Sequence, residues 1–126
     1  MNKPLQTKDL KSNKHIPNID VTKKDELFQI SVSVGKGKAH PNINTHHIAW
    51  IKVYFHPSGE RFPYMIGKFD FTAHGVLEKG VNPDAIYTHP EVVCFLGTGK
   101  PGTLHASSYC NVHGLWSGTA ELGNLN

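Results

Sequence analysis

A cysteine and a histidine lie close together near the C-terminus, in the motif Cys110-Asn111-Val112-His113-Gly114. A Cys and a His three positions apart in a tight loop can both face one metal ion, because the loop turns the chain back within a single ligand sphere. The motif alone is compatible with a metal site or with a small thiol that packs in the core.

Two earlier segments could supply further imidazole ligands. His40 and His46 lie in a loop that includes Pro41, and His15 follows Lys14 in the N-terminal region. The nine histidines are dispersed through the chain, which excludes a His-tag or a metal-buffering tract. Each histidine by itself could be a solvated loop residue, whereas imidazole and thiolate ligands together suit a transition metal.

The elements that must position these residues are predicted to be short strands. Alternating apolar and polar residues over 26–34 predict a half-buried strand. Further strands are predicted over 47–55, 62–73, 91–96, 103–109 and 115–122. Glycine- and proline-containing turns separate the strands, and no helical apolar pattern lasts more than about two turns. We therefore predict an all-β protein, an immunoglobulin-like antiparallel β-sandwich of about seven strands.

The length and composition predict one domain over residues 1–126, with residues 1–25 as an extended N-terminal arm and loop. The net charge of +3 comes without an aromatic-basic stacking motif, so we expect no nucleic-acid partner, although a small anion would be attracted. No apolar run approaches the ~20 residues that span a bilayer. Only two cysteines are present, which is too few for a disulfide scaffold, and we expect a cytoplasmic protein with no membrane association.

The order of the candidate ligands resembles that of the superoxide reductase family, also called neelaredoxins or the catalytic domain of desulfoferrodoxins. The resemblance extends to residues 71–75, residues 109–116 and the strand after His47, so it spans nearly the whole chain. It implies one mononuclear non-haem iron, Fe2+/Fe3+, bound by four equatorial imidazoles and one axial thiolate with the sixth position open. By motif position these ligands are His15, His40, His46, His113 and Cys110. The implied activity is the one-electron reduction of superoxide to hydrogen peroxide.

The resemblance also assigns roles outside the ligand set. Lys14 matches a family lysine near the open position, where an ammonium group would attract superoxide and hold a proton-delivering water. Asn13 stands where the family usually has a glutamate that closes the oxidised site, so the sixth ligand of the oxidised iron is undefined here. The family resemblance suggests rubredoxin or a similar small iron protein as electron donor, and a homo-oligomer, with a tetramer favoured. Desulfoferrodoxins have an extra domain that binds iron through four cysteines, and the two cysteines of this chain indicate the single-iron type instead.

Several other residues are expected to have structural roles. We expect Cys94 to be a core thiol, His74 to be a hydrogen-bonded structural histidine, and Trp116 to pack beside the metal loop. The backbone N–H groups of residues 111–113 are expected to hydrogen-bond the Cys110 sulfur and tune the metal.

Three alternatives remain open at this point. A blue-copper electron carrier is also a β-sandwich with a C-terminal Cys-x-x-His loop, but it uses two histidines, one cysteine and usually a nearby axial methionine. A structural zinc site normally closes at four ligands, whereas five candidates are present here. The third alternative is an immunoglobulin-like binding module with incidental histidines. Metal analysis of the purified protein separates the three.

Overall fold

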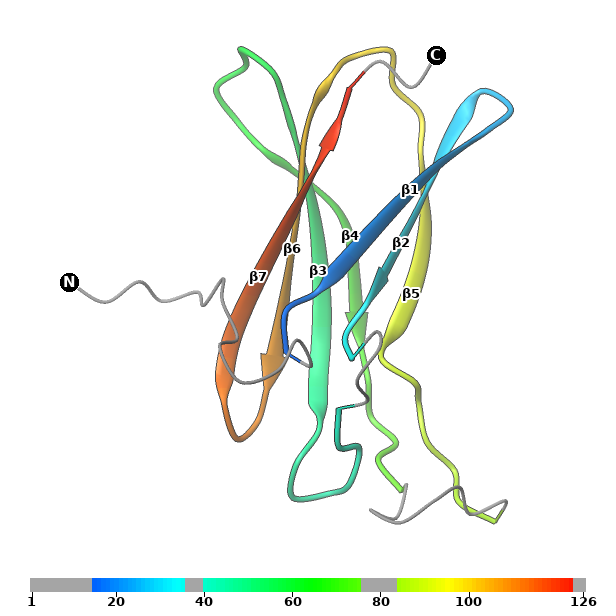
Figure 1. Cartoon of the computed structure of the whole chain (residues 1–126), viewed down its shortest axis with the longest axis vertical. Helices are drawn as coiled ribbons and strands as arrows, with labels where there is room; N and C mark the ends of the chain where they lie inside the picture. Colours follow the sequence, from blue (N-terminus) through cyan, green and yellow to red (C-terminus); the bar gives the residue numbers. More distant parts are fainter. Residues whose placement is uncertain (1–14, 36–39, 76–83, 124–126) are drawn as a thin grey trace, which may run out of the picture.

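The computed structural model describes residues 15–35, 40–75 and 84–123, and within these ranges the chain forms strands and no helix. The strands are β1 (Asn18–Lys24), β2 (Leu27–Ser33), β3 (Ile48–Pro57), β4 (Tyr64–Asp70), β5 (Glu91–Leu96), β6 (Gly102–Cys110) and β7 (Gly114–Leu122) (Figure 1). The described part of the chain therefore contains no helix that could cross a membrane.

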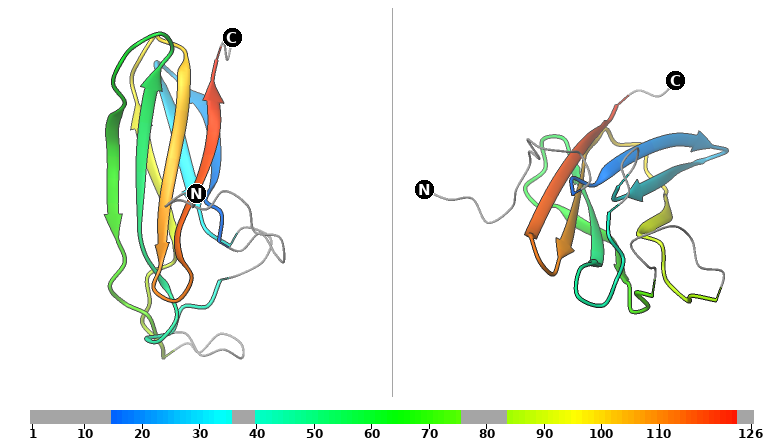
Figure 2. Two further views of the ribbon diagram at one scale, coloured as in Figure 1. Left: turned by 90° about the vertical axis from the view of Figure 1, so that its left-hand side faces the viewer. Right: turned by 60° about the horizontal axis from the view of Figure 1, so that its bottom comes forward.

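The strands form two antiparallel sheets that pack face to face. One sheet has the order β1-β2-β5 and the other the order β4-β3-β6-β7. The right-hand view of Figure 2 shows the two sheets on opposite sides of the molecule. This arrangement confirms the predicted all-β sandwich of immunoglobulin-like type, with β4 joined to the sheet of β3 rather than to that of β5.

Alternate residues of the central strands form the core between the sheets. Ile30 and Val32 of β2, Ile51 and Val53 of β3, and Leu104 of β6 are all fully buried. Successive side chains of a strand point to opposite faces, so residues two apart share the face that is turned to the other sheet. The apolar alternation in the sequence therefore also predicts which side chains fill the core.

The first strand, β1, differs from the sequence-based prediction, which places residues 18–24 in the N-terminal arm. In the structure, Asn18–Lys24 pairs with β2 along its whole length, from Asn18 opposite Ser33 to Lys24 opposite Leu27. The half-buried side chains of Ile19 and Val21 pack against the core and alternate with polar neighbours. The sandwich thus includes residues 18–24, and the prediction of an arm and loop up to residue 25 was wrong for this segment.

One end of the sandwich gathers three segments that are far apart in the sequence. Residues 15–17 lead into β1, residues 40–47 lead into β3, and residues 111–113 connect β6 to β7. Because β3 and β6 are antiparallel neighbours, Ile48 at the start of β3 pairs with Cys110 at the end of β6. The three segments lie in the lower half of the molecule in Figure 1.

Candidate metal site

Four imidazole rings form a closed cycle at this end of the sandwich. The ring centroids are 4.9 Å apart for His15 and His40, 4.8 Å for His40 and His46, 5.0 Å for His46 and His113, and 4.7 Å for His113 and His15. Each ring therefore has two imidazole neighbours at nearly equal distance. This is the arrangement expected of four ligands placed around one central ion.

The donor atoms of the cycle lie at distances that suit a common ion. One ligand atom from each of His15, His40, His46 and Cys110 lies within 4.8 Å of the others. Nδ1 of His113 is 3.1 Å from Nε2 of His15 and 3.7 Å from Sγ of Cys110. Two nitrogen ligands in neighbouring positions on one ion, each about 2.1 Å from it, lie about 3.0 Å apart. The structure thus brings together all five residues predicted as metal ligands.

A backbone contact determines which nitrogen of His40 can bind a metal. Nδ1 of His40 lies 2.7 Å from the carbonyl oxygen of Pro41. Because a carbonyl oxygen only accepts hydrogen bonds, Nδ1 carries the proton and Nε2 keeps the lone pair. Such a contact from the second ring nitrogen is typical of metal-binding histidines, since it orients the ring and selects the tautomer.

The turn between β6 and β7 places the sulfur of Cys110 beside the imidazoles. Cys110 pairs with Gly114, and Gly114 has a φ of 87°, a conformation that favours glycine. The turn directs the backbone N–H of His113 to Sγ of Cys110, 3.3 Å away. The expectation of N–H donors to the sulfur is confirmed for His113, whereas the N–H of Asn111 donates to the carbonyl of His47.

The side chain of Asn111 joins this turn to the loop that carries two other candidate ligands. Its Oδ1 accepts a hydrogen bond from the backbone N–H of His47 at 2.7 Å, and its Nδ2 donates to the carbonyl of Thr45 at 3.1 Å. Both partners flank His46. The amide therefore holds His46 at a defined distance from Cys110 and His113, a role that no local sequence pattern predicts.

We expect Asn111→Ala to lower the affinity for the metal ion by about 10–100-fold, the usual effect of losing a residue that orients a metal ligand. Competition with a chelator of known affinity measures this directly. Asn44→Ala is the matched control, because Asn44 lies in the same loop with an exposed side chain. Equal affinities in the two variants would contradict the assigned role.

His47 and His74 form a stacked pair outside the cycle. Their rings stack with centroids 3.6 Å apart. Nδ1 of His74 is 2.8 Å from Oδ1 of Asn42, and its Nε2 is 2.9 Å from the carbonyl of Phe71, which confirms a hydrogen-bonded structural histidine. Burial lowers the pKa of His74 and His47 lowers it further, against an opposing contribution from Phe71. Of the two neighbouring residues His46 and His47, His46 lies in the cycle. Nδ1 of His47 instead lies 2.9 Å from the carbonyl oxygen of Ile43.

Trp116 and Cys94 have the structural roles that the sequence predicts for them. The Trp116 ring stacks on His15 with centroids 4.7 Å apart, so it does pack beside the metal loop. Cys94 lies half-buried on β5 and packs against the core, and burial raises the pKa of its thiol. Lys14 and Asn13 lie outside the described residues.

Comparisons with known proteins agree with this geometry. The family model for desulfoferrodoxin matches residues 7–119. The chain is 49% identical to neelaredoxin from Megalodesulfovibrio gigas over 89% of its length and 88% of that protein. It is 44% identical to superoxide reductase from Pyrococcus furiosus over 94% of its length and 95% of that protein. The structure of superoxide reductase (neelaredoxin) from Archaeoglobus fulgidus in the reduced form matches with a TM-score of 0.84 and 45% identity, covering 96% of this chain and 99% of that one.

These findings do not favour the blue-copper alternative. A blue-copper site uses two histidines and one cysteine, whereas the group of donor atoms here contains three imidazoles and one thiol, with His113 beside them. The family match over residues 7–119 points in the same direction. The predicted resemblance to superoxide reductases is therefore confirmed.

Proposed function

The chain belongs to the desulfoferrodoxin family of superoxide reductases, and from this membership we propose that it reduces superoxide to hydrogen peroxide at one iron ion. The observation that carries the proposal is the closed cycle of four imidazole rings with the sulfur of Cys110 beside it. Imidazole and thiolate ligands together suit iron, and five protein ligands leave one octahedral position for a small molecule.

The charge of the proposed site suits an anionic substrate. Four neutral imidazoles and the thiolate of Cys110 leave a net charge of about +1 on a ferrous ion, which attracts the superoxide monoanion. When bound, the iron supplies one electron to superoxide. The protein adds the hydrogen bond from the His113 N–H to the sulfur, which withdraws charge from the thiolate and tunes the potential.

Two further residues have proposed roles at the site, one toward the substrate and its protons and one in shielding a ligand from solvent. Lys14, directly before His15, supplies an ammonium group that attracts superoxide and holds a water for proton delivery. Trp116 covers one face of the His15 ring, with an angle of 13° between the two ring planes, and so keeps solvent from that side of the ligand.

The remaining features of the proposal concern the cellular setting. The five ligands would hold one iron per chain, which would alternate between Fe2+ and Fe3+, with rubredoxin or a similar small iron protein as the electron donor. The protein is cytoplasmic, which agrees with its two unpaired cysteines. It assembles as a homo-oligomer, with a tetramer favoured; exposed apolar side chains on the edge strands β4 and β5, such as Met65 and Phe95, are suitable for such contacts.

Measuring the products formed from a pulse of superoxide tests the activity. With an excess of reductant, we expect one hydrogen peroxide for each superoxide consumed and no dioxygen, because the one electron that each superoxide accepts would come from the iron rather than from another superoxide. Dismutation would instead yield one peroxide and one dioxygen for every two superoxide ions. Metal analysis of the same sample should find one iron per chain, and the chelated protein is the control. Copper or zinc in place of iron, or dioxygen as a product, would overturn the proposal.

A further inference from the structure

The segment that carries His15 lies against strands β6 and β7 at three points. The Trp116 ring stacks on the imidazole, and Oγ of Ser108, a fully buried side chain, donates to the carbonyl of His15 at 3.4 Å. Ser108 and Trp116 are paired across β6 and β7. His15 is thus held both at its ring and at its backbone by neighbouring residues of one strand pair.

The third point is Gly118, where the backbone of β7 and the backbone of the N-terminal segment approach closely. A Cβ atom placed on Gly118 would lie 2.3 Å from the carbonyl oxygen of Pro17 and 3.4 Å from its carbonyl carbon. The obstacle is backbone, so no side-chain rotation can relieve the overlap. The carbonyl of Pro17 would have to retreat by roughly 1 Å to reach ordinary van der Waals distance.

The conformation of Gly118 itself does not require a glycine. Its φ lies outside the left-handed region, and Gly118 is opposite Ala106 in the regular register of β6 and β7. An alanine would therefore be acceptable to the strand. The absence of a side chain serves the approach of Pro17, as expected where a glycine inside a strand faces another backbone.

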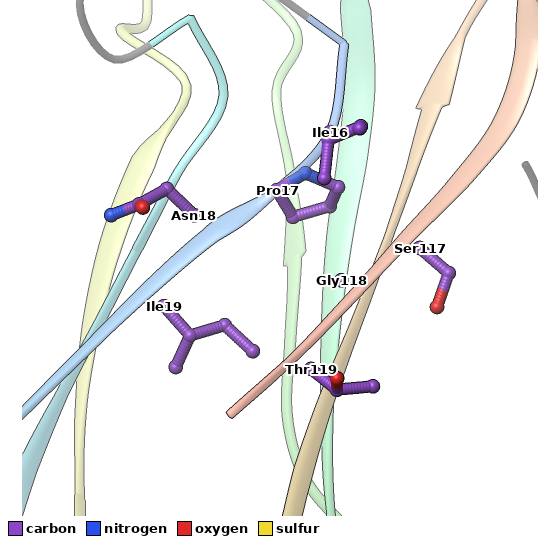
Figure 3. Close-up of a pocket in the computed structure, with 7 residues that line it drawn as sticks. All are labelled: Ile16, Pro17, Asn18, Ile19, Ser117, Gly118 and Thr119. Atoms are coloured by element: carbon purple, nitrogen blue, oxygen red, sulfur yellow. The ribbon is translucent and has the colours of Figure 1, made fainter. Parts of the chain in front are cut away.

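Beside the close approach of Gly118 and Pro17, the N-terminal segment and β7 are separated by a hollow. A hollow of about 350 Å³ lies between the start of β1 and the middle of β7. Figure 3 shows Ile16 to Ile19 along one side and Ser117 to Thr119 along the other. The contact between the two is thus local, and a side chain at 118 would push Pro17 away from β7 and with it His15, two residues earlier in the chain.

We infer that Gly118 and Ser108 are positioning residues for the proposed iron site, and that they act through His15. Gly118 determines how closely the N-terminal segment approaches β7, and Ser108 holds the His15 carbonyl. The inference rests on the proposed function, since it assumes that His15 is an iron ligand. A ligand displaced by about 1 Å binds poorly, so the supporting contacts matter for affinity.

The test is a double-mutant cycle on iron affinity. We expect Gly118→Ala to lower the affinity by about 10–100-fold, and to have no further effect when His15 is already replaced by Ala. Competition with a chelator gives the affinities, and thermal unfolding of the metal-free proteins reports the fold separately. Added imidazole should restore iron binding to His15→Ala, because it can occupy the place that the His15 ring has left.

Gly123→Ala is the matched control, because no heavy atom lies within 4 Å of a Cβ at that position. If Gly118→Ala unfolds, Ser108→Ala takes its place in the same cycle. Losses of affinity that add independently to that of His15→Ala would overturn the inference, as would a lower unfolding temperature with unchanged iron affinity. In either case the parent protein would still bind iron and reduce superoxide, whereas failure of the parent to bind iron would overturn the proposed function as well.

Discussion

Replacement of Cys110 by serine should lower the rate of superoxide reduction by at least about 100-fold, because even a residue that only orients a metal ligand typically contributes 10–100-fold. Cys110 is fully buried, and its sulfur is the one thiol beside the imidazole cycle in the described part of the chain. A serine hydroxyl is a weak donor to the metal and supplies no negative charge at neutral pH. The rate after a superoxide pulse and the thiolate-to-iron absorption band of the oxidised protein are the two measurements.

Cys94→Ser is the matched control for this prediction. Cys94 is the other free cysteine, and burial on β5 raises the pKa of its thiol. We expect this variant to keep both the absorption band and the rate of the parent. If Cys110→Ser kept them too, the sulfur would have no part in the iron site.

Replacement of Leu104 by alanine should lower the free energy of unfolding by about 2–5 kcal/mol, the range for large-to-small changes in a closely packed core. Leu104 is fully buried on β6, among the side chains that join the two sheets. It lies six residues before Cys110 on the same strand, a separation of about 20 Å. Iron affinity of the folded variant should therefore remain close to that of the parent.

Urea unfolding of the metal-free proteins measures the difference in stability. Leu27→Ala is the matched control, because the Leu27 side chain is 42% exposed and a surface change usually alters stability by less than about 0.5 kcal/mol. Equal losses of stability in the two variants would contradict the core role of Leu104. Loss of iron binding in folded Leu104→Ala would show that the core and the site are not separable.

The sequence by itself predicts most of the sheet structure, because each half-buried strand repeats its apolar residues at every second position. The match is closest for β5, predicted and observed over residues 91–96. The strand β1 was missed because it is short of apolar residues: only Ile19 and Val21 pack inward, and lysines end the segment. The half-burial of these two side chains depends on β2 and β7, which a local pattern does not contain.

The identities of the candidate ligands were also accessible from the sequence, since the order of four histidines and one cysteine resembles a known family. Their assembly was not accessible, because the closed cycle joins segments 25 to 98 residues apart. The pairing of β3, β6 and β7 brings together the segments of His46 and His113, and the packing of the sheets adds His15. The contacts of Asn111 depend on the pairing of β3 with β6, and the contact of Gly118 with Pro17 depends on the packing of one sheet against the other. The residue types and their order along the chain thus determined the chemistry, and the tertiary structure decided the distances, since backbone atoms remote in sequence meet only when the two sheets close on one another.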